Sequence, residues 1–442
     1  MAHDLDPLFA PRSVAVYGVS ASDPHKLGNQ LLANVTEGVG DVVCVHPSAT
    51  DIGGTRAVPS LDRAVDLALV SVPARRAEQA VRDAVEAGAR AVVVLSSGFG
   101  EAGPDGRAIE ERITGMTRAA GVRLVGPNCM GVVSDLGGSW LNGSYFWSVP
   151  RISGGLSFLS QSGAFGGMFL SEVRRRELGF ARFLSLGNSP DVDVTHALTW
   201  LADDPATKVI GVFTEGLRDG RAFVRVAREI TPHKPVVVLK GGRGTAGARA
   251  AAGHTGSLAG SARAYRAAFD RAGVVAVEES AEFFDVLTAL SAPLAPRGRR
   301  VAVLTISGGP GVLAADAAER YGLELPPMSP ERQSKIQALA PEFAALANPV
   351  DLTPQCVPAN FGPAIGAVYD EPDIAGVIVI NCGLDIPEFG AGVAEAVAAT
   401  GKPTTAFLLD VPRIRATLGN AGIPCFDSPE AAVRGYAAGV GR

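Results

Sequence analysis

The sequence lacks the patterns that mark several large classes of protein. Cysteine is scarce, and the five residues show no CxxC spacing, which argues against a disulfide framework and against a zinc site. No run reaches the roughly 18 continuous apolar residues of a membrane span, and the first residues lack a charged segment followed by an apolar one. We therefore expect reduced thiols, a cytoplasmic location, no membrane contact and no bound metal.

Long runs of one charge are also missing. The net charge of -5 is small for 442 residues, and no basic stripe of the kind that binds nucleic acid is present. Hydrophobic residues make up 47% of the chain and charged residues 19%, a balance that is typical of well-buried α/β domains. The length predicts two or three such domains.

Short runs rich in Val, Ile and Leu alternate with segments rich in Ala, Glu and Arg, and this alternation starts three times along the chain. It is the pattern of a parallel sheet wrapped by helices. The expected strands are Ser13 to Tyr17, Asp41 to Val45, Leu67 to Val72, Ala91 to Leu95, Arg123 to Val125, Leu156 to Ser160, Phe183 to Leu186, Val209 to Thr214, Val236 to Lys240, Val301 to Ile306, Gly376 to Ile380 and Thr404 to Leu408. The sequence therefore predicts an α/β protein with three doubly wound domains.

A Pro-rich, aperiodic segment near residues 292–298 is the clearest linker. The expected division is a Rossmann-like domain at 1–149, a second α/β domain at 150–291, this linker, and a third domain at 299–442. In such folds ligands collect at the carboxyl ends of the strands.

The loop after the first strand, Gly18-Val19-Ser20-Ala21-Ser22, is a small-residue turn that suits phosphate groups. It is not GxGxxG, and the second strand ends in Val45-His46-Pro47 rather than in the acidic residue that binds the ribose of NAD. An NAD oxidoreductase is thus a weakened alternative.

One histidine stands out from the six in the chain. His254 lies in a long loop of glycines and alanines between an expected strand and an expected helix, and loops of that length in compact domains are commonly functional. A neutral imidazole is a competent nucleophile near pH 7 when a carboxylate orients it. Glu215, at the end of the strand from Val209, is placed for that role.

A nucleophile that carries a phosphoryl group needs an anion site beside it. Ser160-Gln161-Ser162-Gly163-Ala164 follows a strand and opens a helix, so its amides and the helix dipole can hold phosphate. The alternative, Ser162 as the nucleophile of a GxSxG elbow, is weakened because the first glycine is missing. A second glycine turn, with Gly308, Gly309 and Gly311, opens a helix in the third domain.

The front of the chain, PRSVAVYGVSAS, together with its later strand-end loops, resembles the CoA-binding domain of the succinyl-CoA synthetase alpha subunit and of ADP-forming acetyl-CoA synthetases. The resemblance implies contacts with CoA at a set of loop residues. Carried over by position, these are Gly18, Ser20, Lys26, Pro47, Val72, Ser97 and Asn128.

The later motifs GHTGSLAG, FTEGLRDGR, SLGNSPDVD and LADDPATKV resemble the phosphohistidine domain of ADP-forming acyl-CoA synthetases, and ISGGPG with NPVDLT resembles the ligase domain that follows it. The resemblance implies two flavodoxin-like ligase domains, phosphorylation of His254, and an orienting role for Glu215. It also implies that the helix start at Gln161, Ser162 and Gly163 steadies the phosphorylated histidine.

The same resemblance implies a reversible reaction of acyl-CoA, phosphate and ADP that gives acid, CoA and ATP through an acyl phosphate and a phosphohistidine. ATP, ADP and Mg²⁺ would belong to an ATP-grasp beta subunit, because the three domains use the whole length and the chain would be one half of a hetero-oligomer. Transfer of the acyl group to an amine, and a non-catalytic CoA-binding regulator, stay open as alternatives. So does the acyl group itself.

The aromatic stretch Trp140, Tyr145, Phe146 and Trp147 lies near the first domain boundary. Packing between domains is the preferred interpretation, and a lid over the acyl group is the alternative.

Overall fold

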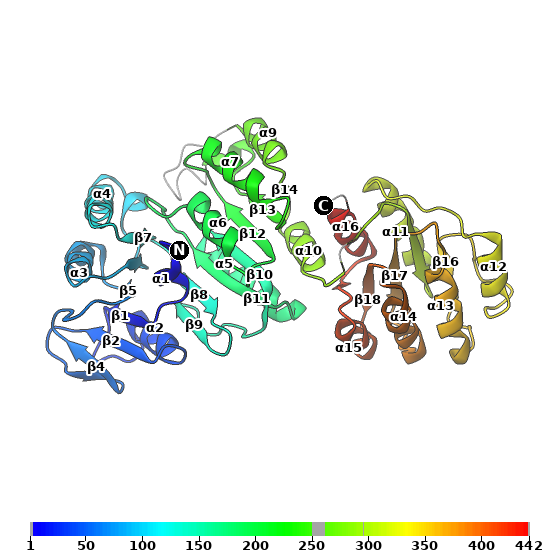
Figure 1. The fold of residues 1–442 in the computed structure, drawn as a ribbon, viewed down its shortest axis with the longest axis horizontal. Coiled ribbons are helices and arrows are strands. Elements are labelled where there is room, and N and C mark those ends of the chain that lie inside the picture. The colour runs from blue at the N-terminus through cyan, green and yellow to red at the C-terminus, as the bar shows by residue number, and fades with distance from the viewer. Residues whose placement is uncertain (1–2, 250–260, 295, 441–442) are drawn as a thin grey trace. The chain divides into compact units, whose positions relative to one another are not determined.

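The computed structural model describes residues 3–249, 261–294 and 296–440. The chain forms two compact units, Met1–Glu278 with two β-sheets and Glu279–Arg442 with one (Figure 1). Within the described ranges, no helix is long and apolar enough to cross a membrane.

The first sheet has seven strands in the order β3-β4-β2-β1-β5-β6-β7, parallel except for the β3–β4 hairpin. Its strands are β1 (Ser13–Tyr17), β2 (Asp41–Val45), β3 (Asp51–Ile52), β4 (Thr55–Val58), β5 (Leu67–Val70), β6 (Ala91–Val94) and β7 (Arg123–Val125). Its helices are α1 (Asp6–Phe9), α2 (Leu27–Thr36), α3 (Ala74–Glu86) and α4 (Pro104–Ala119), with a 3-10 turn η1 (Gly100–Ala102).

Alternate residues of β1 pack on opposite faces of this sheet because side chains of a strand alternate in direction. Val14 and Val16 join the core on the side of α1 and α2, whereas Ala15 and Tyr17 join the core beneath α3 and α4. The strand is buried on both faces, which explains its continuous apolar run.

The second sheet has seven strands in the order β14-β13-β12-β10-β11-β8-β9. Its strands are β8 (Gly131–Asp135), β9 (Trp140–Ser144), β10 (Ser153–Ser160), β11 (Phe180–Ser185), β12 (Val209–Thr214), β13 (Val236–Lys240) and β14 (Val275–Val277). Its helices are α5 (Gly163–Arg176), α6 (Val194–Asp203), α7 (Gly220–Ile230) and α9 (Ala262–Ala272). The β8–β9 hairpin runs antiparallel to β11 at one edge.

A single apolar cluster joins the first two sheets. It contains Val16 of the first sheet and Leu159 of the second. At its edge, Phe9 of α1 stacks on Trp200 of α6 with ring centroids 4.1 Å apart, and the indole N–H donates to Asp6 at 2.9 Å. The shared core explains why both sheets belong to one compact unit.

The third sheet has five strands in the order β16-β15-β17-β18-β19, all parallel. Its strands are β15 (Val301–Thr305), β16 (Val350–Asp351), β17 (Gly376–Cys382), β18 (Thr404–Leu409) and β19 (Cys425–Phe426). The second unit's helices are α10 (Ser280–Leu290), α11 (Gly308–Arg320), α12 (Pro330–Gln337), α13 (Phe361–Tyr369), α14 (Pro387–Thr400), α15 (Pro412–Asn420) and α16 (Pro429–Gly439), with a 3-10 turn η2 (Pro358–Asn360).

Helix α10 precedes the expected linker, yet it packs on α16 in the second unit. The buried carboxylate of Asp285 on α10 forms an ion pair with Arg434 on α16. Truncation of Arg434 would remove the ion-pair partner of a buried carboxylate, which destabilises the fold.

The expected α/β class with three sheets is confirmed, and each expected strand is present to within a few residues at its ends. The strands that the sequence did not reveal are mostly short or lie at sheet edges: β3, β4, β8, β9, β14, β16 and β19.

Candidate functional site

A pocket of about 840 Å³ lies in the first unit, where the carboxyl ends of β1, β5, β6 and β7 meet the start of α5. Residues of both sheets line it: Gly18, His25, Lys26, Leu27, Gly28, Ser71, Val72, Pro73, Leu95, Ser96, Ser97, Asn128, Cys129, Met130, Tyr145, Gln161, Ser162, Gly163, Ala164, Gly187 and Asn188. The lining brings together five of the seven expected CoA contacts and the three residues expected at the α5 anion site.

Close backbone approach shapes the β1 end of this pocket. Gly18 has φ +95°, and a Cβ built there would lie 2.2 Å from the carbonyl oxygen of Ser71. A Cβ on Gly28, in the first turn of α2, would lie 2.2 Å from the carbonyl oxygen of Gly18. Only glycine fits either position, so the turn presents bare backbone to a ligand.

Two expected CoA contacts lie outside the lining. Ser20 is buried, and its hydroxyl accepts from the backbone N–H of Ser22 and Asp23 at 3.4 and 3.2 Å, so it shapes the loop before α2. Pro47 follows His46 after β2, and neither residue lines the pocket.

Asn128 reaches the pocket from the loop after β7 in a left-handed conformation with φ 60°. Its amide donates to the side chain of Asn188 at 3.3 Å, and Asn188 donates in turn to Glu101 and Glu110 at 2.6 and 2.7 Å. Burial raises the pKa of Glu101, but hydrogen bonds from Asn188 and from backbone amides outweigh it and hold the pKa low. The two carboxylates fix Asn188, and through it Asn128, at the pocket wall.

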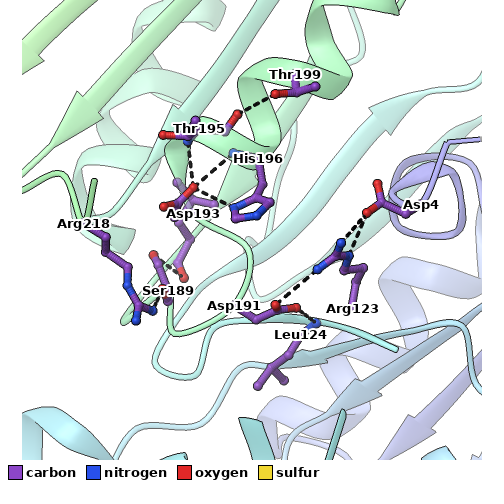
Figure 2. A network of polar contacts seen from close by, with 11 residues as sticks. Asp4, Arg123, Leu124, Ser189, Asp191, Asp193, Thr195, His196, Thr199 and Arg218 are labelled. Atoms are coloured by element: carbon purple, nitrogen blue, oxygen red, sulfur yellow. Dashed lines mark hydrogen bonds and ion pairs between the residues drawn. The ribbon is translucent and has the colours of Figure 1, made fainter. Parts of the chain in front are cut away.

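The SLGNSPDVD motif fastens the loop after β11 to the first sheet (Figure 2). Asp191 accepts from the backbone N–H of Leu124 at 3.0 Å and pairs with Arg123 at 3.3 Å. Asp193 caps α6 through the N–H groups of Thr195 and His196, both within 3.0 Å. The motif thereby positions Asn188 beside the pocket, a role that its sequence alone did not reveal.

The start of α5 is held by side chains that face the loop after β12. Ser162 is the N-cap residue, with its hydroxyl accepting from the N–H of Phe165 at 3.3 Å. Gln161 accepts from the N–H groups of Glu215 and Gly216 at 2.6 and 3.1 Å. Ser162 hydrogen-bonds to no histidine among the described residues, so the structure gives the Ser162 nucleophile no support.

Glu215 follows β12, next to the end of β13, where Lys240 is buried. The Lys240 ammonium lies 4.7 Å from the ring centroid of Tyr265. Burial lowers the pKa of Lys240, while the negative charge of Glu215 acts in the opposite direction. His254 lies outside the described residues, so its contact with Glu215 stays a prediction.

The glycine turn of the third sheet is part of the second unit. Gly308 and Gly309 open α11 directly after Ser307. A Cβ on Gly308 would lie 3.0 Å from the carboxylate of Asp351, and one on Gly311 would lie 3.0 Å from the Thr305 methyl group. The glycines therefore allow close packing of α11 on β15 and β16, and an anion-binding role stays a prediction.

The aromatic stretch divides into two roles. Trp140 packs on Phe180 and Phe146 on Phe183, with ring centroids 5.0 and 5.5 Å apart. Trp147 is 70% exposed. Tyr145 lines the pocket instead. Among the described residues, no group of three or more His, Cys, Asp or Glu side chains could hold a metal ion.

Three domain families match the chain. The families are a CoA binding domain at residues 12–135, a succinyl-CoA ligase like flavodoxin domain at 153–290 and a ligase-CoA domain at 301–413.

Relatives match the chain over almost its full length. The chain is 34% identical to acetate–CoA ligase [ADP-forming] II subunit alpha of Pyrococcus furiosus, over 96% of this chain and 95% of that protein. It is 35% identical to subunit alpha of enzyme I from the same organism, over 98% and 96%. It is 36% identical to acetate–CoA ligase [ADP-forming] I of Archaeoglobus fulgidus, over 97% of this chain but 62% of that protein.

Solved structures agree with these relatives. The dinucleotide-forming acetyl-coenzyme A synthetase 1 of Ca. Korarchaeum cryptofilum, in complex with phosphate and ADP, superimposes with a TM-score of 0.89 at 32% identity. The match covers 98% of this chain and 96% of that one. PH0766 of Pyrococcus horikoshii matches with a TM-score of 0.86 at 30% identity, over 98% of both chains.

Proposed function

Because the chain belongs to the ADP-forming acetate–CoA ligase family, we propose that it is the CoA-binding subunit of an acyl-CoA synthetase and carries a phosphoryl group on His254. The overall reaction converts acid, CoA and ATP to acyl-CoA, ADP and phosphate, and is reversible. It proceeds through an acyl phosphate and a phosphohistidine.

One observation carries the proposal: a single pocket joins the CoA loops of the first sheet to the N-terminus of α5 in the second. The two reactants of the first step, a thioester and inorganic phosphate, need such adjoining sites. The five lining residues expected to contact CoA supply one site, and the free amides and dipole of α5 supply the other.

The pocket fits CoA as a substrate. The bare backbone at Gly18 and Gly28 accommodates a phosphate, and the lining's basic residues, His25 and Lys26, both come from the loop before α2. Among the described residues, the rest of the lining has no Lys, Arg, Asp or Glu. We therefore assign the nucleotide of CoA to the β1 end of the pocket and its acyl group to the α5 end.

In the acyl-CoA-consuming direction, a phosphate oxygen attacks the thioester carbonyl, the C–S bond breaks, and the CoA thiolate leaves. One ring nitrogen of His254 then attacks phosphorus, and the carboxylate leaves as the acid. Glu215 accepts the N–H of the other ring nitrogen, which orients the imidazole and stabilises the cation that forms. Gln161 holds the backbone of Glu215 for this role.

The nucleotide step requires a second component. The matching Pyrococcus proteins are named subunits alpha, which supports a hetero-oligomer in which an ATP-grasp beta subunit binds ADP or ATP with Mg²⁺. The five free cysteines suit a reducing cytoplasm.

Phosphate incorporation tests this function. The chain is incubated with acetyl-CoA and radiolabelled phosphate, and we expect base-stable, acid-labile label on the protein. His254→Asn should abolish the label, whereas His233→Asn, which changes an exposed histidine, should retain it. Full labelling of the His254 variant would refute the assignment. Calorimetric titration should show binding of CoA and none of NAD.

A further inference from the structure

Among the described residues, Tyr145 is the one phenol in the pocket lining, and the proposed reaction has not used it. It follows β9, and its backbone N–H donates to the carbonyl of Met130 at 3.2 Å. Met130 abuts the start of α5, because a Cβ built on Gly163 would lie 2.6 Å from its Cγ. The backbone of Tyr145 is therefore anchored at the α5 end of the pocket.

From this anchor the side chain reaches the first sheet. The phenolic oxygen lies 2.6 Å from the hydroxyl of Ser71, after β5, and Ser96, after β6, lines the same pocket. Tyr145 thus joins the α5 end of the pocket, through its backbone contact with Met130, to the loop after β5, through its hydroxyl.

The hydrogen bonds of this phenol allow its hydroxyl to donate to a ligand. A tyrosine hydroxyl has one proton and two acceptor sites, and each serine hydroxyl can donate one proton to it. Either hydroxyl of the Ser71–Tyr145 pair can be the donor, and when Ser71 donates, the proton of Tyr145 is available to a ligand. Burial raises the pKa of Tyr145, against the hydrogen bond with Ser71, so the group is a protonated donor at neutral pH.

We propose that the Tyr145 hydroxyl donates a hydrogen bond to the thioester carbonyl of the bound acyl-CoA. A hydrogen bond donated by Ser71 leaves this proton directed toward the pocket. As phosphate attacks, negative charge develops on this carbonyl oxygen, and a positioned donor stabilises the tetrahedral intermediate more than the ground state. The inference rests on the proposed function, and it identifies Tyr145 as the residue that binds the carbonyl oxygen of the thioester.

Tyr145→Phe removes the hydroxyl and keeps the ring. With acetyl-CoA and phosphate as donors, single-turnover labelling should slow by about 10- to 100-fold, as for the loss of an oxyanion donor. Labelling from acetyl phosphate breaks a P–O bond and bypasses the thioester, so its rate should stay within about twofold. CoA affinity, measured by calorimetry, should also be unchanged. Trp147→Phe, at an exposed neighbour, serves as the control and should behave as the wild type.

Ser71→Ala tests the orienting role, and it should slow the acetyl-CoA reaction less than Tyr145→Phe does. Equal slowing with acetyl-CoA and acetyl phosphate would overturn the inference, as would parallel loss of CoA binding, because both indicate a structural role. An unchanged rate with acetyl-CoA would also overturn it. If the wild type takes no label from either donor and binds no CoA, the proposed function fails, and the inference with it.

Discussion

At the scale of single residues, the side chain of Gln161 links the start of α5 to the loop after β12, the two parts of the site that we propose act on phosphate. Its carbonyl oxygen accepts from the N–H groups of Glu215 and Gly216 and from the hydroxyl of Thr214, at 2.6 to 3.1 Å. Its amide returns a hydrogen bond to the carbonyl of Gly216 at 3.1 Å. These hydrogen bonds fix the position of the Glu215 backbone relative to the start of α5.

Glu215→Gln tests the orienting carboxylate. The change removes one charge and little volume, so we expect phosphorylation from acetyl phosphate to slow by about 100-fold or more while the thermal unfolding midpoint shifts little. The measurement is single-turnover labelling, with Glu229→Gln on the exposed face of α7 as the matched control. Labelling of the Glu215 variant at the wild-type rate would contradict the proposed orienting role of Glu215 toward His254.

Sequence alone located the glycines and small polar residues of the pocket, because strand-end loops of parallel sheets have a predictable place. It assigned no role to Asn188, and it interpreted the aromatic stretch that contains Tyr145 as packing between domains, with a lid over the acyl group as the alternative; both residues line the pocket. Their roles depend on which way a loop side chain turns after a strand, and no periodicity encodes that. Ser20 follows β1 and Pro47 follows β2, as the sequence predicts. The Ser20 side chain nevertheless turns into the loop before α2, and Pro47 lies outside the pocket lining, because the direction of a loop side chain is not encoded by periodicity.

At the scale of elements, the β1–α2 turn depends on contact between two backbones. The carbonyl of Ser71, after β5, lies against Gly18, and the carbonyl of Gly18 lies against Gly28 in α2. The loop after β5, the turn after β1 and the first turn of α2 thus pack backbone against backbone, with no side chain between them. A ligand phosphate can approach the same backbone closely.

Gly18→Ala should disturb both folding and CoA binding. The positive φ alone costs about 1 to 2 kcal/mol for alanine, and the clash with Ser71 adds about 1 to 3 kcal/mol. Gly53→Ala is the matched control, since Gly53 has φ +61° and a Cβ built there would meet nothing within 4 Å. It should show the conformational cost and bind CoA normally. Denaturant titration and calorimetry measure the two effects, and equal destabilisation of both variants would contradict the packing argument.

The elements that sequence reasoning found are the long, buried strands, whose unbroken apolar runs mark burial on both faces. The sequence did not predict the β8–β9 hairpin because its second strand contains an Asn-Gly pair, which is typical of a turn. That strand is Trp140-Leu141-Asn142-Gly143-Ser144. In the structure both residues pair in register, Asn142 with Val133 and Gly143 with Val132. Pairing of β9 with β8, which in turn pairs with β11, outweighed the local turn preference.

At the scale of the whole molecule, the division into 1–149, 150–291 and 299–442 with a linker at 292–298 stays a proposal. The structure adds two facts that bear on it. The β8–β9 hairpin forms an edge of the second sheet, and α10 packs within the second unit.

The purified chain should not form ATP by itself. From acetyl-CoA and phosphate it should become phosphorylated, because those steps use only the pocket, α5, Glu215 and His254. With ADP present, a coupled luminescence assay should detect no ATP until an ATP-grasp subunit and Mg²⁺ are added. ATP formation by a preparation that mass spectrometry shows to be free of other subunits would contradict the two-chain proposal.

The edge position of the β8–β9 hairpin also limits how the protein can be dissected. A fragment that ends near residue 149 would carry the β8–β9 hairpin, whereas β11, the other pairing partner of β8, would be on the other piece. Each piece would then expose a row of unpaired backbone N–H and C=O groups, which invites aggregation through strand addition. A split or fused variant that is meant to stay monodisperse in solution is better cut before β8, between Val125 and Gly131, than after β9.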